Sequence, residues 1–208
     1  PRALMVTLAV VVAIACSGAR ATSNQSEPQP GIQLGDSVTM PTTAINAAIV
    51  STVAFYVPEK DLLPESIAFD EKDGAFYVGS MRKGKILRVD AKGNASDFIV
   101  PRQDGLWEII GIKVHPTRRM LWVCSFDGPE LEGHKTSDTN ASGVFVFNLD
   151  TGKLVRKWVL DVPGEVHGFN DVTLTRGNDA YVTHMLQEAA IYRITQQDQK
   201  LELFVKTE

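Results

Sequence analysis

A four-strand unit that recurs about every 45 residues is the feature that most constrains the fold of this chain. Each unit opens with a short apolar segment, and a second, a third and a fourth strand-like segment follow in the same order. The opening segments are "ESIAFD" from Glu65, "IGIKVH" from Ile110 and "NDVTLT" from Asn170. The second segments are centred on Tyr77, Trp122 and Tyr181, which lie 45 and 59 positions apart. An insertion of about 14 residues in the middle unit accounts for the longer step.

Four short antiparallel strands per unit predict an all-β fold, a β-propeller of four-stranded blades. A β-sandwich also has many short strands, but it does not repeat them in one order. The expected blades are residues 63–101, residues 108–163 with the insertion 127–143, and residues 168–208. Residues 52–58 resemble a fourth strand, which in a closed ring completes the last blade. Because three blades cannot close a ring, we expect the N-terminal half of a longer protein with about six blades.

The first 21 residues have the pattern of a secretory signal. Arg2 precedes the apolar run Ala3 to Ala15, which is too short to span a bilayer, and small residues follow at cleavage spacing. An alternative is a lipoprotein signal that ends before Cys16, which would then carry lipid. Residues 22–51 are rich in Ser, Gln and Pro near their start and are expected to form a tether of low order. The sequence thus predicts a secreted or periplasmic protein, with a lipid anchor as the alternative.

Charge and composition exclude several classes of protein. The net charge is −4, and no run of Lys or Arg could neutralise a row of phosphates, so a nucleic-acid partner is not expected. A membrane contact is expected only through the possible lipid on Cys16. Cys124 lies in the apolar segment "LWVCSF" and is predicted to be a small buried side chain. The sequons at Asn24, Asn94 and Asn140 matter only if the protein is secreted from a eukaryotic cell.

The opening strands carry the candidate site. In a propeller the first strand of each blade lines the central channel, and Glu65, Ile110 and Asn170 begin these strands here. Carboxylate and amide oxygens that converge from different strands suit calcium or another divalent cation. In the alternative interpretation, Asn170 and Asp171 satisfy backbone groups where the chain enters the strand, and Glu65 is a solvated strand end.

The four histidines share no spacing, which argues against a zinc site. His167 precedes the third opening strand and could act as a proton shuttle or ligand, although a hydrogen-bonded or surface position is the simpler expectation. His115 and His134 are expected at the surface, and His184 is expected to be structural. No serine-hydrolase, phosphate-loop or dinucleotide motif is present in the sequence.

The segments "LPESIAFDEKDGAFYVGSMRKGKILRVD" and "GFNDVTLTRGNDAYVTH" resemble the senescence marker protein, gluconolactonase and LRE-like family of six-bladed propellers. The resemblance covers residues 63–208 and implies a calcium-dependent hydrolase of lactones or related esters. It implies that Glu65 and Asn170 bind the metal and that Asn170 and Asp171 lie near the metal and the substrate. The family's other metal ligands come from later blades. It often has Asp where His184 stands, and some lactonases have a basic residue where Gly168 and Phe169 precede Asn170.

The catalytic residue is not identified by the resemblance, and Asp171 and His167 are the candidates. The rival hypothesis is a non-catalytic propeller of the NHL or Yellow type, which binds a partner or small ligand through its face loops. The long insertion 127–143 motivates this rival, because insertions of a propeller cluster on one face and often make its contacts.

Overall fold

The computed structural model describes residues 52–135, 140–186 and 189–207, all of which belong to one compact unit. Residues 1–51 lie outside the described part, and with them the predicted signal peptide, Cys16, the tether and Asn24. No helix within the described residues is long and apolar enough to cross a membrane.

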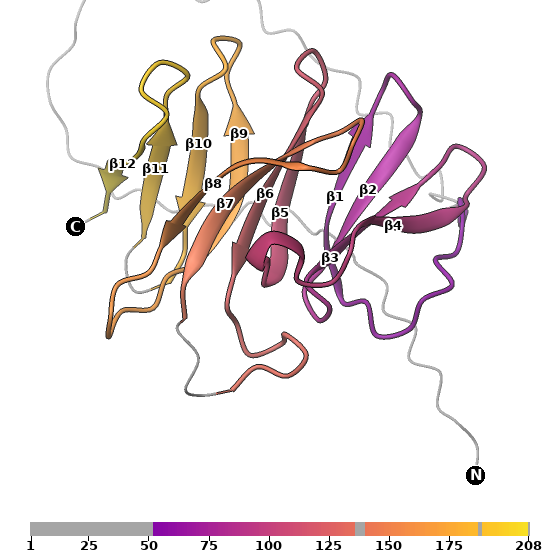
Figure 1. Ribbon diagram of the computed structural model, residues 1–208, viewed down its shortest axis with the longest axis horizontal. Coiled ribbons are helices and arrows are strands. Elements are labelled where there is room, and N and C mark those ends of the chain that lie inside the picture. The colour runs from indigo at the N-terminus through magenta and orange to yellow at the C-terminus, as the bar shows by residue number, and fades with distance from the viewer. Residues whose placement is uncertain (1–51, 136–139, 187–188, 208) are drawn as a thin grey trace, which may run out of the picture. The chain divides into compact units, whose positions relative to one another are not determined.

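In the described residues, twelve strands form three sheets, and each sheet consists of four consecutive antiparallel strands (Figure 1). Blade 1 contains β1 (Pro64–Asp70), β2 (Ala75–Ser80), β3 (Lys85–Val89) and β4 (Ala95–Ile99). Blade 2 contains β5 (Glu108–His115), β6 (Met120–Phe126), β7 (Ser142–Asn148) and β8 (Leu154–Leu160). Blade 3 contains β9 (Phe169–Leu174), β10 (Ala180–His184), β11 (Ala190–Ile194) and β12 (Leu201–Lys206). A short 3₁₀ turn, η1 (Gln103–Gly105), joins the first two blades. The predicted all-β propeller fold is confirmed.

The core lies between the blades, because alternate side chains of each strand point to opposite faces of its sheet. One buried cluster joins Tyr77 and Ile86 of blade 1 to Phe145 and Phe147 of blade 2. A second cluster lies between blades 2 and 3 and includes Cys124, which is fully buried with a pKa raised by burial. The prediction that Cys124 is a small buried side chain is therefore confirmed.

Residues 52–58 lie against the face of blade 1 that points away from blade 2. Phe55 and Val57 pack on a cluster that includes Val78 and Leu87. These two residues are the strand neighbours of Tyr77 and Ile86, whose side chains face blade 2, so their own side chains point to the opposite face. The segment is not part of a strand in the described structure. In a closed ring the last blade meets this face, so the pairing of residues 52–58 with that blade stays a prediction.

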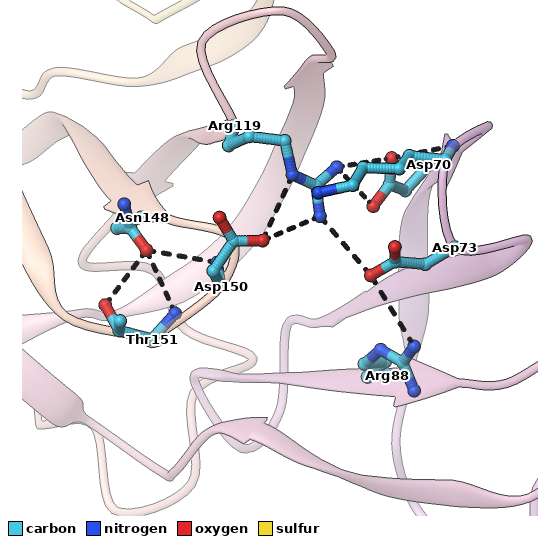
Figure 2. A network of polar contacts seen from close by, with 8 residues as sticks. Asp70, Asp73, Arg88, Arg119, Asn148, Asp150 and Thr151 are labelled. Atoms are coloured by element: carbon cyan, nitrogen blue, oxygen red, sulfur yellow. Dashed lines mark hydrogen bonds and ion pairs between the residues drawn. The ribbon is translucent and has the colours of Figure 1, made fainter.

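A polar clasp joins blades 1 and 2 where the opening strands end (Figure 2). Asp70, the last residue of β1, is fully buried, and Arg119 donates to its two oxygens at 2.7 and 2.6 Å. Arg119 also donates to Asp150 at 3.0 Å and Asp73 at 3.3 Å. The hydrogen bonds to Asp70 raise the pKa of Arg119, so its charge is permanent. Because the Arg119 guanidinium group contacts carboxylates of both blades at once, it fixes the position of one blade relative to the other.

The same clasp recurs between blades 2 and 3. His115, the last residue of β5, lies 2.6 Å from the Asn178 side-chain oxygen through Nε2. Arg119 and Asn178 occupy matching turns and both have positive φ, 52° and 67°. Gly74 of blade 1 has φ 64° at the matching turn. His115, expected at the surface, is partly exposed, and its Nε2 contacts the Asn178 turn of the next blade.

Candidate functional site

Each opening strand contains a β-bulge at the same register. In blade 1, Pro64 pairs with Ser80 and Ser66 pairs with Gly79, so Glu65 is the extra residue. A bulge bends the strand and re-aims the inserted side chain.

Blades 2 and 3 repeat this irregularity. Ile110 is the extra residue between Ile109 and Gly111 of β5. In β9, Asn170 and Asp171 together face Thr183. The equivalence of Glu65, Ile110 and Asn170, predicted from the repeat, is thus a feature of the backbone.

The three bulges open onto one hollow of about 340 Å³ in the channel. All its walls come from β1, β5 and β9, and the lining includes Glu65, Ile110, Lys113, Asn170 and Asp171. The structure therefore brings together three of the four predicted site residues, Glu65, Asn170 and Asp171.

The polar groups of the hollow differ in what they bind. Among the described residues, neither the exposed carboxylate of Glu65 nor the half-buried amide of Asn170 makes a side-chain hydrogen bond or ion pair. Asp171 is different: its Oδ1 accepts the backbone N–H of Val172 at 2.8 Å, and its own N–H donates to Thr183 Oγ1 at 3.0 Å. Asp171 thus serves the backbone in part, as the alternative interpretation proposed, whereas Glu65 and Asn170 keep their oxygens available.

Gly111 allows the opening strands of blades 2 and 3 to approach closely. A Cβ at this position would lie 2.3 Å from the Asn170 carbonyl oxygen and 2.8 Å from the Asp171 Cα. Both neighbours are backbone atoms, which cannot rotate away. The missing side chain therefore fixes Asn170 and Asp171 at the channel wall.

The donor set of the hollow suits a hard cation but is only part of a shell. Calcium takes about six to eight oxygens, and Glu65, Asn170 and the second oxygen of Asp171 supply fewer. In the described ranges, no group of three or more His, Cys, Asp or Glu could hold a metal. A cation at this position would need further oxygens from water, substrate or other residues.

Lys113 is a residue of the hollow to which the sequence analysis gave no role. It also lines a second hollow at the far end of the channel, together with His115 and Leu174. In the sequence, Lys113 stands out as a single charged residue inside the apolar run "IGIKVH". Its ammonium group gives the channel wall a positive charge beside the acidic residues.

The histidine candidate lies elsewhere. His167 is buried, with Nδ1 3.3 Å from Nε2 of His184 and Nε2 3.1 Å from Glu165. His184 Nε2 also lies 3.3 Å from the Gly168 N–H, which supports its expected structural role. His167 is hydrogen-bonded as expected and is not part of the lining of the hollow.

The insertion of blade 2 is anchored by a buried acid, Glu108, at the start of β5. Its side chain is fully buried, and Oε1 accepts the N–H groups of Glu130 and Leu131 at 2.6 and 2.9 Å. Oε2 is buried without a hydrogen-bond partner in the described structure, and burial raises the pKa of Glu108. The N–H of Glu132 donates to the Arg82 carbonyl at 2.7 Å. The insertion therefore bridges blades 1 and 2.

The insertion and the hollow lie at the same end of the blades. The insertion follows β6, whose last residue, Phe126, pairs with Glu108 at the start of β5. His134, expected at the surface, belongs to this insertion, where its Nδ1 lies 3.1 Å from Asp127, and it is only partly exposed. It is less exposed than expected, because the insertion folds back on its own first residues.

The sequence matches no protein-family model and no curated protein. Solved structures do match, and they are β-propellers. The major allergen Mala s 1 of Malassezia sympodialis has a TM-score of 0.56 and 18% identity over 71% of this chain and 50% of its own. A gluconolactonase from Xanthomonas campestris has a TM-score of 0.50 and 15% identity, and covers 70% and 48%. Virginiamycin B lyase from Staphylococcus aureus has a TM-score of 0.51 and 17% identity, and covers 74% and 45%.

At these identities the likeness shows the fold alone. The chain spans about half the length of these structures. The fold and the site together define this chain as a β-propeller with a polar hollow in its channel.

Proposed function

We propose that this chain belongs to a secreted, calcium-dependent propeller hydrolase of lactones or related esters. The observation that carries the proposal is the hollow in which Glu65 and Asn170, on equivalent bulges of different blades, both keep unpaired oxygens. Support also comes from the gluconolactonase and the lyase among the propellers of similar fold. Export through residues 1–21 is part of the same proposal.

Each polar residue of the hollow has a part in this proposal. Glu65 and Asn170 would hold the cation through their side-chain oxygens, and Asp171 would orient a water molecule with the oxygen that the backbone does not use. A cation held there would supply Lewis-acid activation of an ester carbonyl. Lys113 binds a polar or anionic group of the substrate from the same wall.

Calcium titration by calorimetry, with lactone hydrolysis followed on the same samples, tests the proposal. Glu65→Gln removes the charge and Asn170→Ala removes the amide oxygen, so each substitution should weaken calcium binding at least tenfold. Hydrolysis should fall in parallel, because the same cation activates the carbonyl.

Glu71→Gln is the matched control, since Glu71 is an exposed carboxylate just beyond the far end of β1. It should bind calcium and hydrolyse lactones like the parent protein. Calcium binding that survives Glu65→Gln and Asn170→Ala unchanged would rule out this hollow as the metal site.

A second candidate function is a propeller that binds a partner or small ligand through its face loops. The observation in its favour is the anchored insertion, which Glu108 and the Arg82 carbonyl hold at the end of the channel where the hollow lies. Absence of both calcium binding and lactone hydrolysis in the titration above would favour this candidate.

A further inference from the structure

A cavity of about 90 Å³ lies between blades 2 and 3, and it shares no residue with the channel hollow. One side comes from the strands β6, β7 and β8 of blade 2. The other comes from blade 3, where Asn178 and the turn after β11 close it. Its size is below the roughly 300 Å³ typical of sites for drug-sized ligands, so only a small molecule would fit.

Two stacked tryptophans form the aromatic wall of this cavity. The rings of Trp122 and Trp158 are 5.8 Å apart and almost parallel, with 10° between their planes. Trp158 is fixed from the opposite blade, because its Nε1 donates to the Gln199 carbonyl at 2.8 Å. Met120, Val146 and Ile194 add apolar surface. The wall is therefore rigid and suits an apolar group.

The charged groups of the cavity are both positive. Arg118 and Arg156 belong to its lining, which contains no Asp or Glu. The Arg156 guanidinium lies 5.9 Å from the centre of the Trp158 ring, over its face. In the described part of the chain, neither arginine forms an ion pair. An occupant that combines an apolar body with one negative charge would complement both the wall and the arginines.

The matching groove between blades 1 and 2 has the opposite character. Its lining contains one arginine, Arg88, and three carboxylates, Asp73, Asp97 and Asp150. Its aromatic side chain, Phe98, packs edge-on against Tyr77 at 4.8 Å. A cationic, tryptophan-walled cavity is thus particular to blades 2 and 3 and is not a property of every gap between blades.

We propose that the cavity between blades 2 and 3 is a second binding site that takes a short-chain monocarboxylate. The apolar chain lies against Trp122 and Trp158, and the carboxylate faces Arg118 and Arg156. This site is independent of the proposed hydrolase activity, since it shares no residue with the channel hollow.

Tryptophan fluorescence provides a direct test with sodium butyrate as the probe, because butyrate does not absorb where indole does. The chain has three tryptophans, so a Trp107→Phe background leaves only the two in the cavity. Butyrate should change the emission saturably, with a midpoint in the millimolar range expected for so small a ligand. Butyramide, which has the same chain without the charge, should cause a much weaker change at equal ionic strength.

Arg156→Gln in the same background should raise the butyrate midpoint at least tenfold. Arg193→Gln is the matched control, because Arg193 also lies over an aromatic ring, Phe204, but outside the cavity. It should titrate like the background protein. The proposal is overturned if butyrate causes no saturable change, if butyramide acts as strongly, or if Arg156→Gln leaves the midpoint unchanged.

Discussion

Glu108 shows how one buried acid can determine the position of a long loop. Its carboxylate accepts two N–H groups of the insertion, yet one of its oxygens is buried without a partner. Burial disfavours the charged form and raises the pKa above the ordinary value of 4.5. The folded protein therefore binds this proton more tightly than the unfolded protein does. As the pH rises above 4.5, the unfolded state loses the proton more easily than the folded state, so the free energy of unfolding falls.

Glu108→Gln should remove that pH dependence, because the amide keeps an acceptor for the N–H groups of Glu130 and Leu131 but cannot ionise. Below pH 4.5 the two proteins should have similar stability. As the pH rises towards neutrality, the parent protein should lose stability relative to the variant. Thermal unfolding across this pH range measures the difference.

Glu71→Gln is again the control, since it removes an exposed carboxylate of the same kind. Its melting temperature should follow the parent at every pH. Parallel pH profiles of the melting temperature for Glu108→Gln and the parent protein would contradict a raised pKa of Glu108 in the folded state.

Sequence alone identifies some site residues and not others. Glu65, Asn170 and Asp171 could be predicted because the repeat places them at equivalent strand starts. Glu108 could not, because an acidic residue ahead of an apolar run normally indicates a solvated end. Its burial depends on residues 130 and 131, which return to it from the insertion.

At the scale of secondary-structure elements, the contact between β5 and β9 is set by Gly111. The two opening strands belong to different blades and share no ladder, so only side-chain volume controls their separation. Gly111 brings the backbone of β5 against the Asn170 carbonyl. The position of Asn170 in the hollow therefore depends on a missing side chain in the neighbouring blade.

Gly111→Ala should destabilise the protein by about 1–3 kcal/mol, the usual cost of overpacking a buried contact. The added methyl group has to push β9 away, so the calcium binding proposed at Asn170 should weaken as well. Urea unfolding measures the first effect and calorimetry the second.

Gly177→Ala is the matched control, because a Cβ there meets its nearest atom, Thr175 Oγ1, at an ordinary 3.6 Å. It should change the free energy of unfolding by less than about 1 kcal/mol. Equal stability of the Gly111→Ala and Gly177→Ala variants would contradict the close approach of β5 and β9.

The strands and their order follow from the alternation and the turn residues, and the structure reproduces them. The bulges could not be predicted, since one extra residue in a short strand leaves its apolar pattern almost unchanged. Nor could the clasp residues, because Arg119 and Asn178 each lie in a turn whose partner is in another blade.

At the scale of the whole molecule, two blade faces in the described part of the chain are apolar and exposed. Ile67 and Phe69 of blade 1 are 61% and 46% exposed, and Phe204 of blade 3 is 49% exposed. In a closed propeller each such face packs against a neighbouring blade. Uncovered faces of this kind promote association.

The 208-residue chain on its own should therefore self-associate. A double variant, Ile67→Lys with Phe204→Lys, should sediment more slowly, because a charge on each face opposes its burial. Sedimentation velocity of the two proteins at equal concentration measures the change. Val100→Lys, at an exposed position after β4, controls for added charge and should associate like the parent. A monomeric parent chain would contradict the prediction.

The clasps also mean that the blades are not interchangeable modules. Asp70 is matched to the arginine of the next blade, whereas His115 is matched to an asparagine. Duplicating blade 2 in tandem would set a copy of Arg119, with its own copy of Asp150, opposite the imidazole of His115 in place of the carboxylate of Asp70. A blade of this chain can therefore be exchanged without loss of the clasp only if the turn residue of the adjoining blade changes with it. Each joint is specified by the strand-end residue of one blade and the turn residue of the next.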